Sequence, residues 1–301
     1  MWVWYSLFFA FWSSIGAVLV KNLSKKIKPL PLLYAVFLFN VPASFILLFF
    51  VGGIPKVTTE FYIFISISAI LDVIALSSYF VAINQTAISI LFPISSFSVI
   101  FTTIIAAFTL HEVPTGIKFI GILLVVIGAY LLNIADIKGG IMKPFKLLFS
   151  NKGVLLFLLS NLIWSITPIF QKKAIFETSP QVPLFPSFFG MLLVLLILTP
   201  FAIKKAIASF KEISSNVKWF AFNGIGTAFA QAAAFAAFSL TYLGYATAVF
   251  RLSTLFIIIF GGVFLKEERI KERLLGGELW SSAQFCSLCS SILIFALNLT
   301  I

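Results

Sequence analysis

Residues 60–83 read EFYIFISISAILDVIALSSYFVAI, an apolar stretch with one charge, Asp72, near its middle and another, Glu60, at its start. A helix crosses the hydrocarbon core of a bilayer with about 20 residues. A charged side chain that faces lipid at the bilayer centre costs from about +3 to above +10 kcal/mol, so such residues usually face a partner or a water-filled path. The stretch therefore predicts a membrane helix that borders a polar interior.

The rest of the chain has the same apolar character. Of its 301 residues, 61% are hydrophobic and 10% are charged, and the mean hydropathy is +1.11. Soluble domains carry about 25% charged residues, and barrel strands would be shorter and alternate in polarity. Helices satisfy their own backbone hydrogen bonds in lipid. We therefore expect an all-α, multi-pass protein of the cell membrane with ten spans, at residues 2–20, 31–51, 60–83, 86–109, 116–135, 153–172, 183–203, 218–240, 244–265 and 276–299.

The net charge of +11 comes from the segments between the apolar stretches. With these spans, and with a lysine at the end of a span counted with the adjoining loop, alternate loops carry 16 of the 21 Lys and Arg residues, and the positive-inside rule would place both termini outside the cell. Basic loops between spans orient a membrane protein, so nucleic acid is not an expected partner. The run 266–273 is interpreted as a loop that contacts anionic lipid headgroups.

A second charge inside a span is Arg251, about seven residues into the ninth helix, whereas Asp72 lies about twelve residues into the third. At about 1.5 Å per residue, their depths differ by about 5–8 Å. We expect the two to approach each other across a cavity, either as a resting ion pair or as separate anchors for a zwitterion. An Arg suits a carboxylate or phosphate, and an Asp suits an amine or a coupling proton. The alternatives are a purely structural pair and an Arg that reaches the nearer interface.

Five further residues are candidates for substrate binding, and each has a structural alternative. Gln231 and Asn161 can donate hydrogen bonds to substrate, or can join helices to one another at about 0.6–2 kcal/mol each. Trp12 and Trp164 can stack on a substrate or anchor their helices at the interface. Tyr79 can contact substrate or serve only in packing.

The two halves of the chain look alike. Trp12-Ser13-Ser14-Ile15 in the first span matches Trp164-Ser165-Ile166 in the sixth, and a lysine follows each Trp by nine residues, at Lys21 and Lys173. Several ordered matches of this kind indicate an internal repeat. Five spans per half is an odd number, so the second half must enter the membrane from the opposite side, as in inverted-repeat transporters. The expected units are 1–138 and 152–301, joined by 139–151.

These features give the chain a resemblance to the drug/metabolite transporter superfamily, specifically its ten-helix EamA-like members. The matching motifs are the two Trp-Ser openings, the run YFVAINQTAISILFP at 79–93, and the acids that end helices four and nine, Glu112 and Glu268, with Gly121, Gly128 and Gly277 after them. The resemblance implies a secondary transporter of small metabolites, often an exporter of amino acids or related compounds, with a central cavity between the halves. It also implies cytoplasmic termini, against the charge distribution. The unusually polar tenth span departs from the family pattern.

Other functions have little support in the sequence. There is no nucleotide-binding G-x-x-x-x-G-K-[ST] motif, and His111 is the single histidine. Cys286 and Cys289 lie in an apolar stretch and are interpreted as small helix residues. We expect no catalytic residue, no metal and no cofactor, and Glu112 is expected to cap a helix or pair with Lys118, Lys266 or Arg269. A membrane-embedded enzyme and a non-transporting scaffold are the alternative functions; the substrate and the oligomeric state are not indicated.

Overall fold

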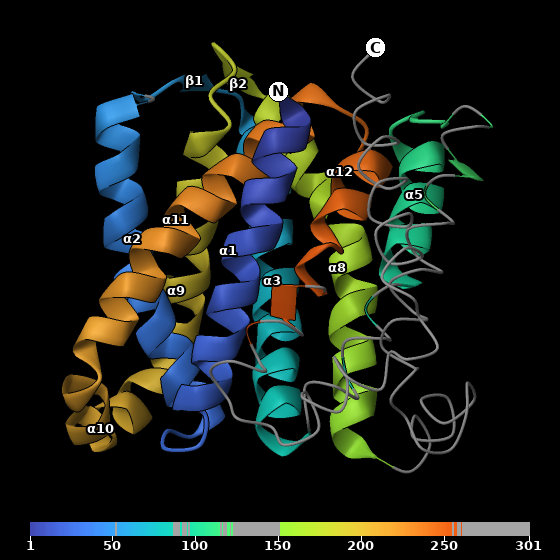
Figure 1. The fold of residues 1–301 in the computed structure, drawn as a ribbon. Helices are drawn as coiled ribbons and strands as arrows, with labels where there is room; N and C mark the ends of the chain where they lie inside the picture. The colour runs from blue at the N-terminus through green and yellow to red at the C-terminus, as the bar shows by residue number, and fades with distance from the viewer. Residues whose placement is uncertain are drawn as a thin grey trace.

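The fold is a bundle of long apolar helices (Figure 1). The computed structural model describes residues 1–51, 53–86, 91, 95, 97–114, 116, 119–120, 122, 151–254, 256–257 and 260. Within them, six helices are long and apolar enough to cross a membrane: α1 (Trp2–Leu23), α2 (Pro29–Val51), α3 (Thr59–Gln85), α8 (Lys152–Phe176), α9 (Leu184–Ala208) and α11 (Val217–Leu240). The shorter elements are α5 (Phe97–Thr109), α10 (Phe210–Ser215), α12 (Leu243–Phe250), β1 (Lys56–Val57) and β2 (Thr178–Ser179).

These six helices confirm six of the predicted spans. Their starts follow from side-chain caps: Thr58 accepts a hydrogen bond from the N–H of Phe61, and Asn151 accepts from the N–H groups of Gly153 and Val154. The helices α8 and α9 extend past their predicted ends at 172 and 203. The reason is that lysines in a last helical turn can hold their charge at the interface while their stems stay on the apolar surface.

The helices α3 and α8 form an antiparallel pair that is joined at both ends. At one end β1 pairs with β2, and the Thr58 hydroxyl donates to Glu177 at 2.7 Å. At the other end the Thr86 hydroxyl lies 3.3 Å from the Asn151 side-chain oxygen. Because the chain's N-terminus lies at the β1–β2 end in Figure 1, we call that end the N-terminal face and the other end the opposite face.

The first helices of the two halves run in opposite directions. The end of α1 meets the end of α3 on the opposite face, where Lys21 Nζ donates to the carbonyl oxygen of Ile83 at 2.6 Å. In contrast, α8 ends on the N-terminal face, beside β2. The halves therefore have inverted topology, as the odd number of predicted spans indicated.

The break predicted between the eighth and ninth spans is confirmed, since α11 ends at Leu240 and α12 begins at Leu243. The ninth span differs from the regular helix expected for 244–265. Helix α12 ends at Phe250, and the N–H groups of Arg251 and Leu252 bond to carbonyls only three residues back. Such an interruption within a span is typical of helices that border a binding site in transporters.

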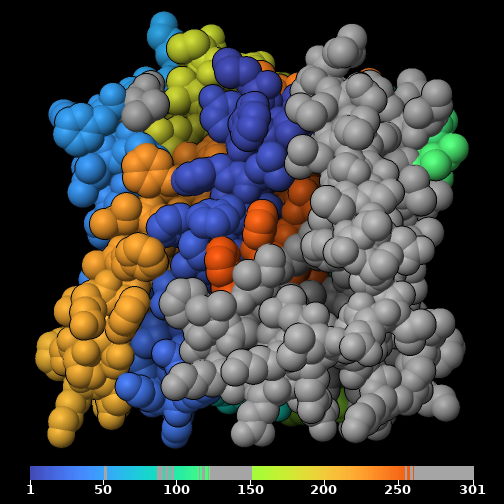
Figure 2. Space-filling model, viewed as in Figure 1, coloured from blue at the N-terminus to red at the C-terminus, as the bar shows by residue number. Residues whose placement is uncertain are grey.

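The outer surface of the bundle is apolar, as lipid requires. Large side chains such as Phe49, Phe50 and Phe108 are about four-fifths exposed, at 77%, 79% and 81%. Contiguous apolar surface of this kind is rare on soluble monomers. Figure 2 shows α1 and α11 in contact along one side of the molecule, and Gly226 of α11 makes that contact possible because a side chain there would overlap Trp12 of α1. The protein is a multi-pass membrane protein.

Several predictions fall on residues outside the described part of the chain. These are the fifth and tenth spans beyond residue 122, the linker 139–151 except its last residue, the basic run 266–273, Glu268, the two cysteines and most of residues 87–96.

Candidate functional site

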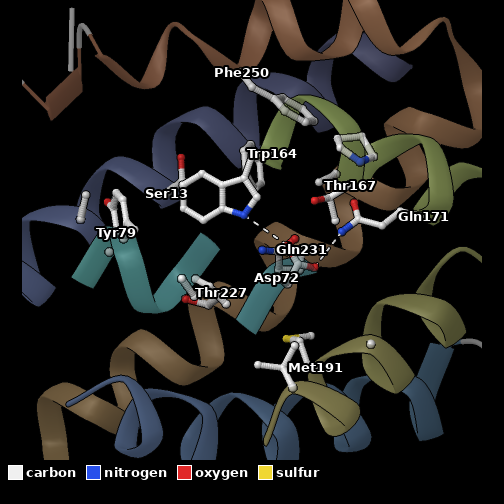
Figure 3. Close-up of a pocket in the computed structure, with 18 of the residues that line it drawn as sticks. Ser13, Asp72, Tyr79, Trp164, Thr167, Gln171, Met191, Thr227, Gln231 and Phe250 are labelled. Atoms are coloured by element: carbon white, nitrogen blue, oxygen red, sulfur yellow. Dashed lines mark hydrogen bonds between the residues drawn. The ribbon is translucent and has the colours of Figure 1, made fainter. Parts of the chain in front are cut away.

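A cavity of about 360 Å³ lies at the centre of the bundle, between the two halves. Its walls come from α1, α2, α3, α8, α9, α11 and α12, and Figure 3 shows part of them. Six of the seven candidates predicted from the sequence line it: Asp72, Tyr79, Asn161, Trp164, Gln231 and Arg251. Among the described lining residues, Asp72 and Arg251 alone carry a charge.

Neutral donors surround the carboxylate of Asp72. The indole N–H of Trp164 donates to Oδ1 at 3.2 Å, and the amide of Gln171 donates to Oδ2 at 3.2 Å (Figure 3). The Ser68 hydroxyl, one turn earlier on α3, lies 3.5 Å from Oδ2. A carboxylate can accept about four hydrogen bonds. The site therefore holds the charge in place and leaves it able to accept from a further donor.

Arg251 lies where α12 ends and the span is interrupted. Its terminal nitrogen Nη2 donates to the Ser98 hydroxyl, and its Nε is buried with no hydrogen-bond partner among the described residues. Within that part of the chain, Arg251 and Asp72 make no ion pair. Of the two arrangements expected for these charges, the structure thus shows two separately held groups in one cavity and no resting pair.

An aromatic wall stands beside the carboxylate. The ring of Tyr79 lies 5.2 Å from that of Trp164 and 5.8 Å from that of Phe157, centroid to centroid. These separations are typical of favourable tilted ring pairs. The wall offers apolar surface to the uncharged part of a ligand, next to the negative charge.

Trp12, the seventh candidate, is not among the residues that line the cavity. Its ring packs on Phe222 at 5.2 Å, and a methyl group on Gly226 would overlap its indole. Its neighbour Ser13 lines the cavity, as Trp164 does (Figure 3). A one-residue step turns a side chain by about 100° around a helix, which accounts for the different positions of the two tryptophans.

The structure shows the repeat at the level of single residues. The lining positions of α1 and α8 correspond at a constant spacing of 151 residues: Ser13 with Trp164, Gly16 with Thr167, Ala17 with Pro168 and Val20 with Gln171. Those of α3 and α11 correspond at a spacing of 155: Ser68 with Asn223, Asp72 with Thr227, Leu76 with Gln231, Tyr79 with Ala234 and Phe80 with Phe235. The backbone positions repeat, whereas most of the polar side chains do not.

Sequence reasoning missed several cavity residues. Gln171 lies seven residues after Trp164, on the same face of α8, so helical periodicity could have identified it. Asn40, Ser187 and Asn223 line the cavity at 2–3% exposure, and each has a side-chain oxygen with no hydrogen-bond partner within the described residues. A buried polar group without a partner costs about 1–3 kcal/mol. These three groups therefore favour a ligand or water that can form hydrogen bonds.

Glu112 has a partner that was not predicted, and the predicted capping role is confirmed. Glu112 pairs with Lys172 and accepts a hydrogen bond at 2.7 Å from the N–H of Leu243, so it caps the start of α12. The reason is that Glu112 and the end of α8 meet on the N-terminal face, where both charges are buried. The partners expected from the sequence, Lys118, Lys266 and Arg269, lie outside the described residues.

Comparison with known proteins agrees with this architecture. The sequence matches the EamA-like transporter family over residues 1–134 and 151–297. The chain belongs to the EamA-like transporter family. This family consists of transporters and not of enzymes, and the two matched segments are the two halves of an EamA double domain, consistent with ten helices.

A solved structure supports the fold of this EamA-like chain. A matching solved structure, titled only "Crystal structure of protein", superposes on this chain with a TM-score of 0.63 and shares 14% sequence identity with it. The match covers 98% of this chain and 94% of that chain. At this identity the likeness concerns the fold alone. No curated protein matches the sequence significantly.

Replacing Trp164 with Phe should raise the KM for transport about fivefold with little change in stability. Phe keeps the aromatic wall beside Tyr79 but removes the N–H that donates to Asp72, and one hydrogen bond is worth about 1 kcal/mol. The measurement is concentration-dependent uptake into proteoliposomes. The matched control is Trp12→Phe, which should leave KM unchanged because Trp12 does not line the cavity. Equal KM values for the two variants would contradict the assignment of Trp164.

Proposed function

We propose that this protein is a secondary transporter that moves small metabolites, such as amino acids or related compounds, across the cell membrane by alternating access, with export as the expected direction. The observation that carries the proposal is the cavity between two inverted halves, in which a carboxylate, a guanidinium and an aromatic wall face one space. Membership of the EamA-like family supports transport, and the cavity supports the substrate class.

The two charges suit the two ends of a zwitterion. Asp72 takes a protonated amine, because its present donors are neutral and leave its negative charge uncompensated. Arg251 takes a carboxylate through the N–H groups that do not contact Ser98. The rings of Tyr79 and Trp164 pack on the apolar part between them. A cavity of about 360 Å³ lies near the lower end of the range for ligand pockets, which favours small metabolites.

A proton is the candidate coupling ion in this proposal. In a cavity with one acidic side chain among the described lining residues, proton and amine compete for the same oxygens of Asp72. Binding of one then excludes the other, and each crosses the membrane in exchange. The halves would rock about this central site, which inverted topology allows because either face can open while the site stays fixed.

Counterflow in proteoliposomes tests the proposal. Liposomes loaded with a high concentration of one unlabelled amino acid or nucleoside should accumulate the same labelled compound transiently, and the initial rate should saturate with concentration. Empty liposomes provide the control. A non-transporting scaffold would show no accumulation with any compound of a broad panel, and a channel would show flux without counterflow; either result would contradict a carrier.

A further inference from the structure

Three chain segments meet at a buried polar cluster on the N-terminal face, away from the charges of the cavity. Lys172, in the last turns of α8, pairs with Glu112, which follows α5; the two side chains are 6% and 7% exposed. Lys172 Nζ also donates to the carbonyl of Thr241 at 2.6 Å, and the N–H of Leu243 donates to the second oxygen of Glu112. We call Glu112, Lys172 and the turn 241–243 the polar cluster.

The polar cluster joins the two halves of the molecule. Glu112 comes from the first half, whereas Lys172 and the turn between α11 and α12 come from the second. Both carboxylate oxygens of Glu112 are engaged, one by the ammonium group and one by the backbone. His111 has a φ of 56°, in the left-handed region, and this turn directs the acid inward after α5.

A cluster of this kind suits a contact that must form and break. A buried ion pair gains little net free energy over its separated, hydrated partners, because attraction is offset by desolvation. Loss of one partner is different, since it leaves the other charge buried and uncompensated. Water that enters the N-terminal face can therefore separate the two charges at small cost, whereas an apolar contact of equal area would lose its hydrophobic stabilisation outright.

The repeat places a related contact on the opposite face. Lys21 and Lys172 differ by the same 151 positions as the cavity residues of α1 and α8, so Lys172, and not Lys173, is the counterpart of Lys21. Lys21 donates to the carbonyls of Ile83 and Thr86 at the end of α3. Thr86 and Thr241 in turn correspond at the spacing of 155 and cap the ends of α3 and α11. Each face of the cavity thus has a lysine from the first helix of a half, which donates to the end of the third helix of the same half.

We propose that the polar cluster is the gate of the N-terminal face: with Glu112 and Lys172 paired, the cavity is closed on that side, and with the pair separated, it opens there. The proposal builds on the proposed transport function and adds the residues that control access. Lys173 has no part in it, since it lies over the ring of Phe64.

Accessibility of the cavity to a thiol reagent tests the gate without any substrate. The probe is Thr227→Cys, which lines the cavity, in a Cys286→Ser and Cys289→Ser background. A membrane-impermeant maleimide is added to the N-terminal face or to the opposite face in oriented vesicles. Glu112→Gln and Lys172→Gln should each accelerate labelling from the N-terminal face about tenfold, which corresponds to a loss of ~1.4 kcal/mol in the free energy of closing.

Two further variants make the result decisive. Lys21→Gln, on the opposite face, should accelerate labelling from that face and not from the N-terminal face. Glu112→Asp keeps the charge but withdraws it by one methylene, so it should fold and give a smaller acceleration; it replaces Glu112→Gln if the latter aggregates. Unchanged labelling in folded Glu112→Asp and Lys172→Gln proteins would overturn the gate. Labelling that responds as expected, in a protein without counterflow, would instead contradict the transport function.

Discussion

Asp72→Asn should lower kcat/KM for transport by about 10- to 100-fold, because a hydrogen bond to a charged group contributes about 1.5–3 kcal/mol. Asn has the shape of Asp but no charge, and its amide nitrogen would face the donor groups that now bind the carboxylate. A protonated amine then loses its counter-charge in a cavity where no other acidic side chain is found among the described lining residues. Initial rates of counterflow over a range of concentrations give the measurement.

The repeat supplies a matched control for this prediction. Thr227 is the counterpart of Asp72 in the second half and lines the same cavity. Thr227→Val keeps the side-chain shape and removes one neutral hydroxyl. The change in kcat/KM should therefore be about twofold, which corresponds to the lower end, about 0.5 kcal/mol, of the contribution of a neutral hydrogen bond. If Asp72→Asn transports at the rate of the unmodified protein, the carboxylate only holds helices together.

The two charges of the cavity could be predicted from the sequence because lipid leaves few places for them. A residue such as Asp72 or Arg251, alone in an apolar stretch, must face the interior whatever the details of packing. The span boundaries followed from the same rule. Whether Asp72 and Arg251 contact each other could not be predicted in this way, because the depth of a residue along its helix does not say which side of the helix it faces. Side chains of α8 donate to Asp72, and the Ser98 hydroxyl of α5 accepts from Arg251, so each charge has a partner other than the opposite charge.

The missed contacts depend on helix rotation, which composition does not determine. Two Trp-Ser motifs that look equivalent differ by one position around the helix, so Trp164 faces the cavity and Trp12 faces α11. Similarly, the partner of Glu112 could not be identified from loop charges. Lys172 is the last residue of the predicted span 153–172, yet α8 continues to Phe176 and Lys172 is buried on the N-terminal face, where Glu112 lies.

Symmetry and asymmetry are divided between different parts of this molecule. Backbone positions, the terminal lysines of α1 and α8 and the threonine caps of α3 and α11 repeat between the halves, and these are the parts that a symmetric opening of two faces requires. Most of the side chains at the cavity positions do not repeat: Asp72 is matched by Thr227 and Tyr79 by Ala234. An asymmetric substrate needs one charged anchor of each sign in defined places, so the proposed recognition residues are those at which the repeat has diverged.

Gly226→Ala should be the most destabilising single methyl addition in α11, costing about 1–3 kcal/mol as overpacking typically does. The new methyl group would overlap the indole of Trp12, so the ring must leave the contact between α1 and α11, where small residues allow helices to approach in lipid. The thermal midpoint in detergent should fall by several degrees.

The matched control is Gly190→Ala, whose new methyl group meets only the mobile end of Ile65, at 3.2 Å, and should change the midpoint less. Adding Trp12→Leu should restore the midpoint of the Gly226→Ala protein, because it removes the overlapping ring; a double variant less stable than Gly226→Ala alone would show that the overlap is not the cause.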